Sequence, residues 1–266
     1  MGLRQAAPHS IRSMPLNREI GPGAGEAFER VDVGQWAQAE RLRLVFRNLP
    51  VTLAVSVACA CILAGLLRQT VRPLPLLGWA AAGVLISCLR YRGYRQFRRA
   101  GEPLDTHRWG RLLTLGTGAS GLFWGSSAVV LFPPGDLSHQ VLIVFVLAGV
   151  SAGAMTSYAA VRRCYFAFVL PTVIPVAVRM AMEPTEINHG MAFLTLLFLG
   201  VVIRAAIETD RTIGSILSAR AENARLLQEL RHQATHDALV DLPNQREFHS
   251  RLYRAAASKS RVYTNR

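Results

Sequence analysis

Lysine is almost missing from this sequence, and its scarcity decides what the charge means. The chain has 266 residues and 30 basic side chains, and Lys259 is the single lysine, so the formal net charge of +13 is nearly all arginine. These arginines flank long apolar runs and do not gather with aromatic side chains on one surface. That arrangement is typical of membrane topology signals and argues against nucleic-acid binding, so we expect no nucleic-acid partner.

Cysteine pairs of the metal-binding type are also missing. The four cysteines are Cys59, Cys61, Cys88 and Cys164, and no two of them have CxxC spacing. Three lie inside apolar runs. We therefore interpret the cysteines as small buried apolar side chains and expect no metal site built on them.

The N-terminal segment lacks the apolar core of a signal peptide. Residues 1–26 contain Gly and Pro and predict a flexible tail. Residues 27–47 read as an amphipathic helix that leads into the membrane, with Trp36 suited to the interface. A plain cytoplasmic helix explains the same residues.

Long apolar runs dominate the middle of the chain, and hydrophobic residues make up 51% of the whole. A membrane-spanning helix needs roughly 20 apolar residues, and such runs cross lipid singly only as helices. The sequence therefore predicts an all-α, polytopic membrane helical bundle with about six spans, which forms a sensory region over residues 48–207. The predicted spans are 48–67, 75–89, 112–132, 141–161, 166–182 and 191–207.

Arginine is distributed unequally between the predicted loops. The segments before the first span, between the second and third, and between the fourth and fifth contain arginine, whereas those after the third and fifth contain acids and no arginine. By the positive-inside rule we predict a multi-pass protein of the bacterial inner membrane with both termini cytoplasmic. Arg68 and Arg72, in the first outer loop, depart from this rule.

Acidic residues are absent from all six predicted spans, which leaves a proton or cation relay without an obvious carrier. Gly121 and Gly125 are spaced four apart, and so are Gly149 and Gly153. This spacing favours close packing of helices, and a small ligand pocket is the alternative.

The last two predicted spans contain residues that are unusual in lipid. Pro171 and Pro175 predict a kink in the fifth span. Arg179 and Arg204 lie near span ends, where a long side chain can reach the interface.

The predicted outer loops contain His139 and His189 near Asp136, Glu183 and Glu186. A periplasmic metal or ligand sensor could be built from such residues. Both loops are short and no ligand spacing repeats in them. We therefore assign no catalytic, cofactor-binding or metal-binding residue in this chain.

Residues 208–233 are rich in helix-forming residues and predict a linker helix. Its heptad seam consists of Ile213, Ile216, Leu227, Leu230 and Ala234, and is interrupted by Arg220 and Asn223. This pattern favours a helix that continues out of the membrane into a parallel dimeric coiled coil, with a solvated single helix as the alternative. The expected partners are the lipid bilayer and a second chain, in a homodimer or a mixed dimer.

The segment ATHDALVDLPNQREF, residues 234–248, ends the linker with a polar turn. Pro243 stops the preceding helix, Asn244 suits an N-cap, and Glu247 stands three residues later, as in a capping box. Phe248 and Leu252 then share one face of a new helix. These residues alone predict a helix, a turn and a helix, and nothing catalytic.

The sequence of this segment resembles the start of the GGDEF domain of diguanylate cyclases, which typically reads D-x-L-T-x-L-P-N-R-R-x-F. The matching residues are Asp237, Leu239, Leu242, Pro243, Asn244, Arg246 and Phe248. The departures are Val240 in place of Thr, Asp241 in place of Gly and Gln245 in place of Arg. In this family the domain often follows a multi-span membrane sensor through a helical linker, as it would here.

The resemblance implies a family reaction that condenses two GTP molecules into cyclic di-GMP, with metal ions held by carboxylates. In the family those carboxylates and the GG(D/E)EF hairpin come later in the domain, and the sequence up to Arg266 contains neither. We therefore expect residues 234–266 to be the truncated start of a GGDEF domain, inactive as given. No cofactor is expected in this chain, although Mg and GTP would be implied for a complete family member.

Two other functions fit the same residues. His232 and His236 follow the linker, where a sensor histidine kinase places its phospho-acceptor, although the residues after His236 differ from that pattern. The other is a non-catalytic membrane protein that forms mixed dimers with intact cyclases through residues 213–230.

Overall fold

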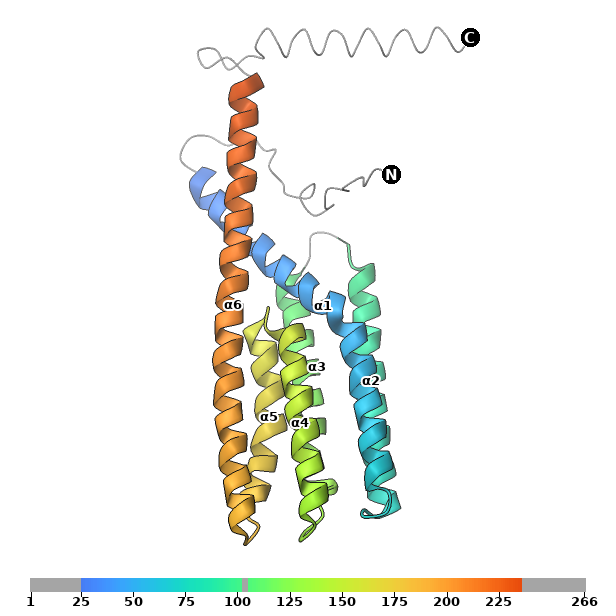
Figure 1. The fold of residues 1–266 in the computed structure, drawn as a ribbon. Helices are drawn as coiled ribbons and strands as arrows, with labels where there is room; N and C mark the ends of the chain where they lie inside the picture. The colour runs from blue at the N-terminus through green and yellow to red at the C-terminus, as the bar shows by residue number, and fades with distance from the viewer. Residues whose placement is uncertain (1–24, 102–104, 236–266) are drawn as a thin grey trace, which may run out of the picture. The chain divides into compact units, whose positions relative to one another are not determined.

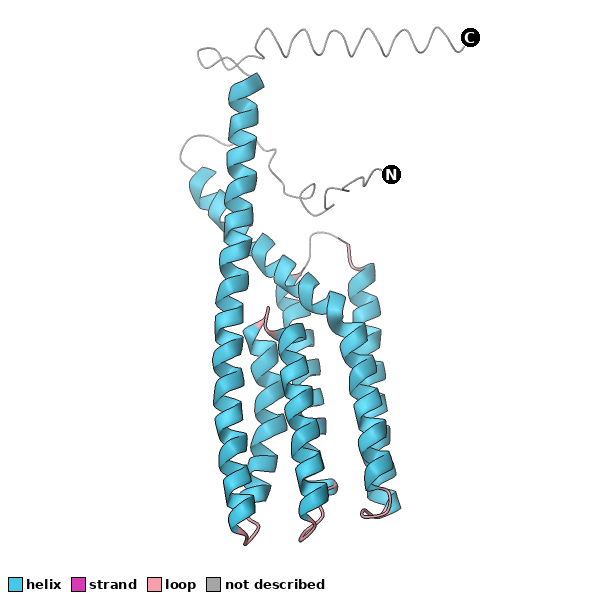
Figure 2. Cartoon of the chain, in the orientation of Figure 1, coloured by secondary structure: helices cyan, strands magenta, loops and turns pink. Residues whose placement is uncertain are grey.

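The computed structural model of the chain describes residues 25–101 and 105–235, and all regular structure there is α-helical (Figures 1 and 2). The helices are α1 Gly25–Leu67, α2 Pro73–Arg99, α3 Thr106–Val130, α4 Leu137–Tyr158, α5 Arg162–Ala181 and α6 Glu186–Thr235. No strand occurs among the described residues. The prediction of an all-α fold is confirmed for this part of the chain.

The chain divides into two units between Gly214 and Ser215. The bundle lies in the unit that ends at Gly214, and within it successive helices run in opposite directions (Figure 1). The turns after α1, α3 and α5 lie at one end of this bundle, and α2 and α4 end at the other (Figure 1). Helix α6 continues past Gly214 to Thr235 in the second unit.

Helices α1 and α2 extend well beyond the predicted first and second spans. The lead-in helix and the first span form one helix, α1, which runs through Pro50. The predicted second span ended at residue 89, but α2 continues to Arg99. Residues 90–99, which we had placed in a loop, extend the helix because arginine is a good helix former and no proline interrupts them.

Within the part of the chain that the structure describes, five helices are long and apolar enough to cross a membrane. They are the segments Gly34–Leu67, Pro73–Arg99, Leu137–Tyr158, Arg162–Ala181 and Glu186–Leu227. Helix α3, our predicted third span, is 25 residues long but is not in this group. Its Gly, Ser and Thr residues lower its hydropathy, and many of them are buried, whereas Leu115, Leu122 and Val129 form its exposed apolar face.

The bundle also leaves large apolar side chains on its surface. On α1 and α6 these include Val51, Ile62, Phe193, Leu197 and Val201, all of which are exposed. Apolar surface of this extent is unusual on a soluble monomer. It is compatible with a lipid bilayer around the helices.

Candidate functional site

The two glycine pairs have different surroundings. Gly121 and Gly125 of α3 face α5, and a Cβ atom added at either position would overlap a backbone carbonyl oxygen of that helix. A Cβ atom added at Gly149 or Gly153 of α4 would meet nothing within 4 Å. Close packing, our first interpretation of the spacing, is therefore confirmed for the α3 pair, whereas the α4 pair borders open space.

The two prolines of α5 explain how α3 comes so close. An α-helical N–H normally donates to the carbonyl four residues earlier, and proline has no N–H to donate. Pro171 and Pro175 therefore leave the carbonyl oxygens of Ala167 and Pro171 without that donor. The Pro171 oxygen is the nearest atom to a Cβ atom added at Gly125; at Gly121 the nearest oxygen is that of Phe168, and the Ala167 oxygen lies 3.0 Å from the added Cβ atom. Weak Cα–H···O contacts are expected across such an interface.

The open space beside the α4 glycines is a cavity of about 250 Å³ that five helices enclose. Its polar lining consists of Thr52, Ser56, Arg90, Ser120, Thr156, Ser157 and Tyr158, and its apolar lining includes Val51, Val55, Cys59, Val150, Ala154 and Phe168. A single water needs only about 10–15 Å³, whereas pockets for drug-sized ligands hold about 300–1,000 Å³. The cavity therefore has the size for a small ligand, or for the head of a longer one.

Arg90 brings a permanent positive charge to the wall of this cavity. Its Nη1 donates to Ser120 Oγ at 2.9 Å, its Nη2 donates to Tyr158 Oη at 3.0 Å, and its Cζ lies 5.5 Å from the centre of the Tyr158 ring. The side chain is half-buried. Among the residues that the structure describes, no carboxylate pairs with it. Two contacts leave three of the five guanidinium N–H groups available.

Three hydroxyl groups of the cavity wall also have hydrogens to donate. Ser120 and Tyr158 accept from Arg90, and Ser56 Oγ accepts from the indole Nε1 of Trp124 at 3.1 Å. No described residue accepts a hydrogen from any of these three hydroxyls. The site therefore offers N–H and O–H donors without a carboxylate, which suits recognition of a ligand more than bond-making chemistry.

A hydrogen bond between α1 and α4 borders the same cavity. Thr52 Oγ1 donates to the carbonyl of Asn48 at 3.0 Å, so Ser157 Oγ is the donor in the 2.7 Å bond that joins the two hydroxyls. The mouth of the cavity lies beside this bond, between α1 and α4, where Val51 and Val55 are 68% and 55% exposed. It opens sideways, onto an apolar face of the bundle.

Sequence reasoning missed Arg90 as a site residue, because we counted it among the loop arginines that set topology. In the structure it lies inside α2 and on the inward face of that helix. The signal was present in the spacing of Leu76, Trp79 and Gly83, which are buried at helical intervals along α2. Arg90 continues the same stripe seven residues after Gly83.

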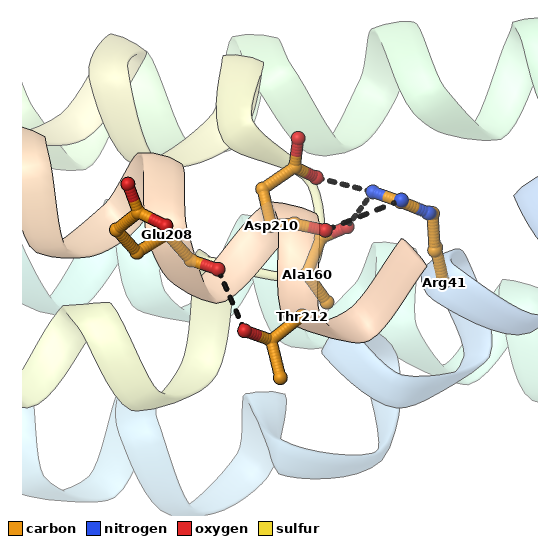
Figure 3. Close-up of polar contacts among 5 residues, drawn as sticks. All are labelled: Arg41, Ala160, Glu208, Asp210 and Thr212. Carbon is orange, nitrogen blue, oxygen red and sulfur yellow. Dashed lines mark hydrogen bonds and ion pairs between the residues drawn. The ribbon is translucent and has the colours of Figure 1, made fainter. Parts of the chain in front are cut away.

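Arg41 forms a second polar cluster, at the end of the bundle where α4 ends (Figure 3). Its Nη1 donates to the backbone carbonyl of Ala160 at 3.1 Å and to a carboxylate oxygen of Asp210 on α6. Its Nη2 donates to the backbone carbonyl of Asp210 at 3.4 Å. Gly214 adjoins this cluster, because an added Cβ atom there would lie 2.8 Å from Arg41 Nη2. One side chain thus connects α1, the turn after α4, and α6.

The opposite end of the bundle contains the residues considered for an outer metal site. His139 Nδ1 lies 2.6 Å from Asp136 Oδ2, and His139 Nε2 lies 3.2 Å from Thr70 Oγ1. Hydrogen bonds from the backbone and side chain of His139 hold the pKa of Asp136 below its usual 3.8. Asp136 is also the N-cap of α4, so this pair fixes the start of that helix.

The remaining outer-loop residues do not join that pair. Glu183 accepts from Arg179 at 2.8 Å, and Arg179 lies over the ring of Phe132, with its Cζ 4.6 Å from the ring centre. Glu186 and His189 are exposed on α6. Within residues 25–101 and 105–235, no three His, Cys, Asp or Glu side chains come together in a way that could hold a metal ion.

The other predicted residues are placed as follows. All four cysteines are free; Cys164 is buried, Cys59 is half-buried, and Cys61 and Cys88 are exposed. The predicted burial is thus confirmed for Cys164 and wrong for the two exposed thiols, which lie on apolar helices. Residues 236–266, which include His236 and every residue that matches the GGDEF start, lie outside the described residues.

No protein-family model, curated protein or solved structure matches the chain.

Proposed function

We propose that this chain is the membrane-embedded input region of a signalling protein of the diguanylate cyclase type, followed by a linker helix and the start of a GGDEF domain. The observation that carries the proposal is the match from Asp237 to Phe248 in the sequence. The described architecture supports it, because a bundle of apolar helices precedes this motif and α6 runs as one helix from Glu186 to Thr235, next to the motif.

In this proposal all six bundle helices cross the inner membrane, and both termini lie in the cytoplasm. Arginines at the ends of α2 and the start of α5 support this orientation, because positive residues collect on the cytoplasmic side. Helix α3 crosses with Leu115, Leu122 and Val129 on its exposed face and its small polar residues against its neighbours. Reporter fusions after Arg99 and after Thr235 should both report cytoplasm, and a fusion at Gly135 should report periplasm; the reverse result would contradict the orientation.

Signal transfer would pass through the linker helix to a pair of output domains. Ile216, Leu227 and Leu230 are exposed on α6, as expected for a seam that a second chain covers. The Arg41 cluster supports a connection between the bundle and this helix, because Asp210 receives its hydrogen bonds in the first turn of the linker. Movement of α1 or of the turn after α4 would then shift α6.

A fusion protein tests the relationship to cyclases. Residues 1–248 are joined, at the matching motif, to the remainder of an active GGDEF domain, and cyclic di-GMP is measured in cells that lack other cyclases. We expect cyclic di-GMP above that of the same fusion with its catalytic carboxylates replaced. A fusion that reaches the membrane but makes no more than this inactive control would contradict the proposal.

The same fusion tests the two contacts that support signal transfer. Asp210→Asn should lower cyclic di-GMP output about five-fold or more, which is a typical coupling between two sites. Glu208→Gln is the matched control, because the Glu208 carboxylate pairs with Arg211 on its own helix, at 3.1 Å. Co-purification of two differently tagged chains should be lost when Leu227 and Leu230 are replaced by Glu, and retention of the pair would contradict the dimer seam.

A further inference from the structure

The cavity at Arg90 contains a charged group that neither the membrane topology nor the linker helix explains. A guanidinium group in a largely apolar bundle is costly to bury unless an anion or several acceptors compensate its charge. Arg90 has two hydroxyl acceptors and no carboxylate partner among the described residues. It also faces open space of about 250 Å³.

The groups around this space are arranged to donate hydrogen bonds. Arg90 has three further N–H groups, and the hydroxyls of Ser120 and Tyr158 each accept from Arg90, so that their own hydrogens are free to turn toward a ligand. The Ser56 hydroxyl also has its hydrogen free to donate, because its oxygen accepts from Trp124. A site composed of donors around a fixed positive charge selects an anion, and a carboxylate can take two parallel bonds from a guanidinium group.

The mouth of the cavity defines the rest of the ligand. Val51 and Val55 on α1 and Gly149 and Gly153 on α4 are exposed lining residues, so most of its rim is apolar; Thr156 is the exposed polar residue of the lining. Because the rim lies on the side of the bundle, an apolar tail can leave between α1 and α4 and enter the lipid. A phospholipid head with its glycerol and two chains would exceed this space, whereas a single chain passes.

We infer that this cavity binds a single-chain amphiphile with a carboxylate head, which enters from the bilayer and places its head on Arg90, Ser120 and Tyr158. The inference goes beyond the proposed function: it depends on the membrane placement of the helices and not on the relationship to cyclases. It also gives the α4 glycines a role, since they keep the mouth open.

Equilibrium binding of radiolabelled dodecanoate to the full chain in nanodiscs of phosphatidylcholine tests this inference. We expect saturable binding of one molecule per chain, and competition by dodecanol, which has the same tail without the charge, should be about ten-fold weaker or more. Arg90→Gln should weaken binding by a similar factor. Arg95→Gln is the matched control, because Arg95 is exposed on the same helix and does not line the cavity.

Two further variants keep the test decisive if Arg90→Gln fails to fold. Tyr158→Phe keeps the ring and removes one donor, so affinity should fall about three- to ten-fold. Gly153→Leu fills the mouth from a position with open space and should abolish binding without loss of folded protein. Equal affinity for dodecanol and dodecanoate, or unchanged binding in both of these variants, would overturn the inference.

Two competition arms identify the source of the anion. Acetate represents a water-borne carboxylate, and phosphatidylglycerol in the nanodisc represents a phospholipid head. We expect neither to displace dodecanoate at a matched concentration. Displacement by acetate would contradict entry from the bilayer, and displacement by phosphatidylglycerol would contradict the carboxylate head. Because binding is measured without any cyclase output, failure here leaves the fusion experiment unaffected.

Discussion

The α3–α5 interface and the α1–α4 face contain the same glycine spacing and use it in opposite ways. At Gly121 and Gly125 the missing Cβ atoms let α3 lie on the carbonyl groups of α5. At Gly149 and Gly153 the missing Cβ atoms leave a gap that leads to Arg90. The glycine spacing indicates only that another helix could pack closely, and the surface of that neighbouring helix determines whether it does.

The largest effect should follow from a methyl group at the packed pair. In Gly125→Ala the new Cβ atom would overlap the Pro171 carbonyl oxygen, which belongs to the backbone and cannot rotate away. We expect the free energy of unfolding to fall by about 3 kcal/mol or more. Unfolding of the purified chain by SDS in mixed micelles measures the change.

The matched change at the open pair is Gly153→Ala. It should leave the free energy of unfolding unchanged or raise it by up to about 1 kcal/mol, because alanine is the better helix former and the new Cβ atom would meet nothing within 4 Å beyond the backbone of its own helix. Equal losses in Gly125→Ala and Gly153→Ala would mean that the contrast between the two faces is wrong.

An intermediate effect is expected at Gly83 of α2, where the neighbour is a side chain and not backbone. An added Cβ atom would lie 2.5 Å from Cζ of Phe123, whose ring stacks on Trp79 with 4.5 Å between ring centres. Because the ring can shift at the cost of this stacking, Gly83→Ala should lower the free energy of unfolding by about 1–2 kcal/mol. Gly78→Ala, on the same helix with no neighbour within 4 Å, is the control. If Gly83→Ala lowered the free energy of unfolding as much as Gly125→Ala, the distinction between a ring neighbour and a backbone neighbour would be contradicted.

The smallest effect lies at Asp136, away from both faces. Folding lowers the pKa of this carboxyl below 3.8, so its contribution to stability is present above that value and is lost as the pH falls through the lowered pKa. Asp136→Asn should have a slightly lower free energy of unfolding than the wild type at about pH 6, and this difference should disappear in acid. SDS unfolding at a series of pH values measures it, and a gap that widens in acid would contradict the assignment.

The length of the apolar runs was sufficient to predict the helices, because runs of Leu, Val and Ala without acids have few other folded states in lipid. It failed at the end of α2, since charge density was taken as the sign of a loop although arginine continues a helix well. It also treated α3 as equivalent to the others. The composition of α3 reflects burial against α5, which is a property of its neighbours and not of its own sequence.

The candidate site was harder to predict because it depends on contacts between distant segments. Arg90 and Tyr158 are 68 positions apart, and nothing local in the sequence joins them. Arg41 and Asp210 are separated by 169 positions, and nothing in the sequence pairs them. Only the stripe along α2 gave a local sign that Arg90 faces inward.

The α3–α5 interface is built from atoms that are absent: two amide hydrogens on α5 and two methyl groups on α3. Restoring either kind alone would spoil the fit, because Pro175→Ala would supply the missing donor to the Pro171 oxygen that Gly125 now faces. The positions of these two helices should therefore vary in concert as the sequence diverges. A glycine on one helix and a proline on the other form a matched pair, lost or kept together.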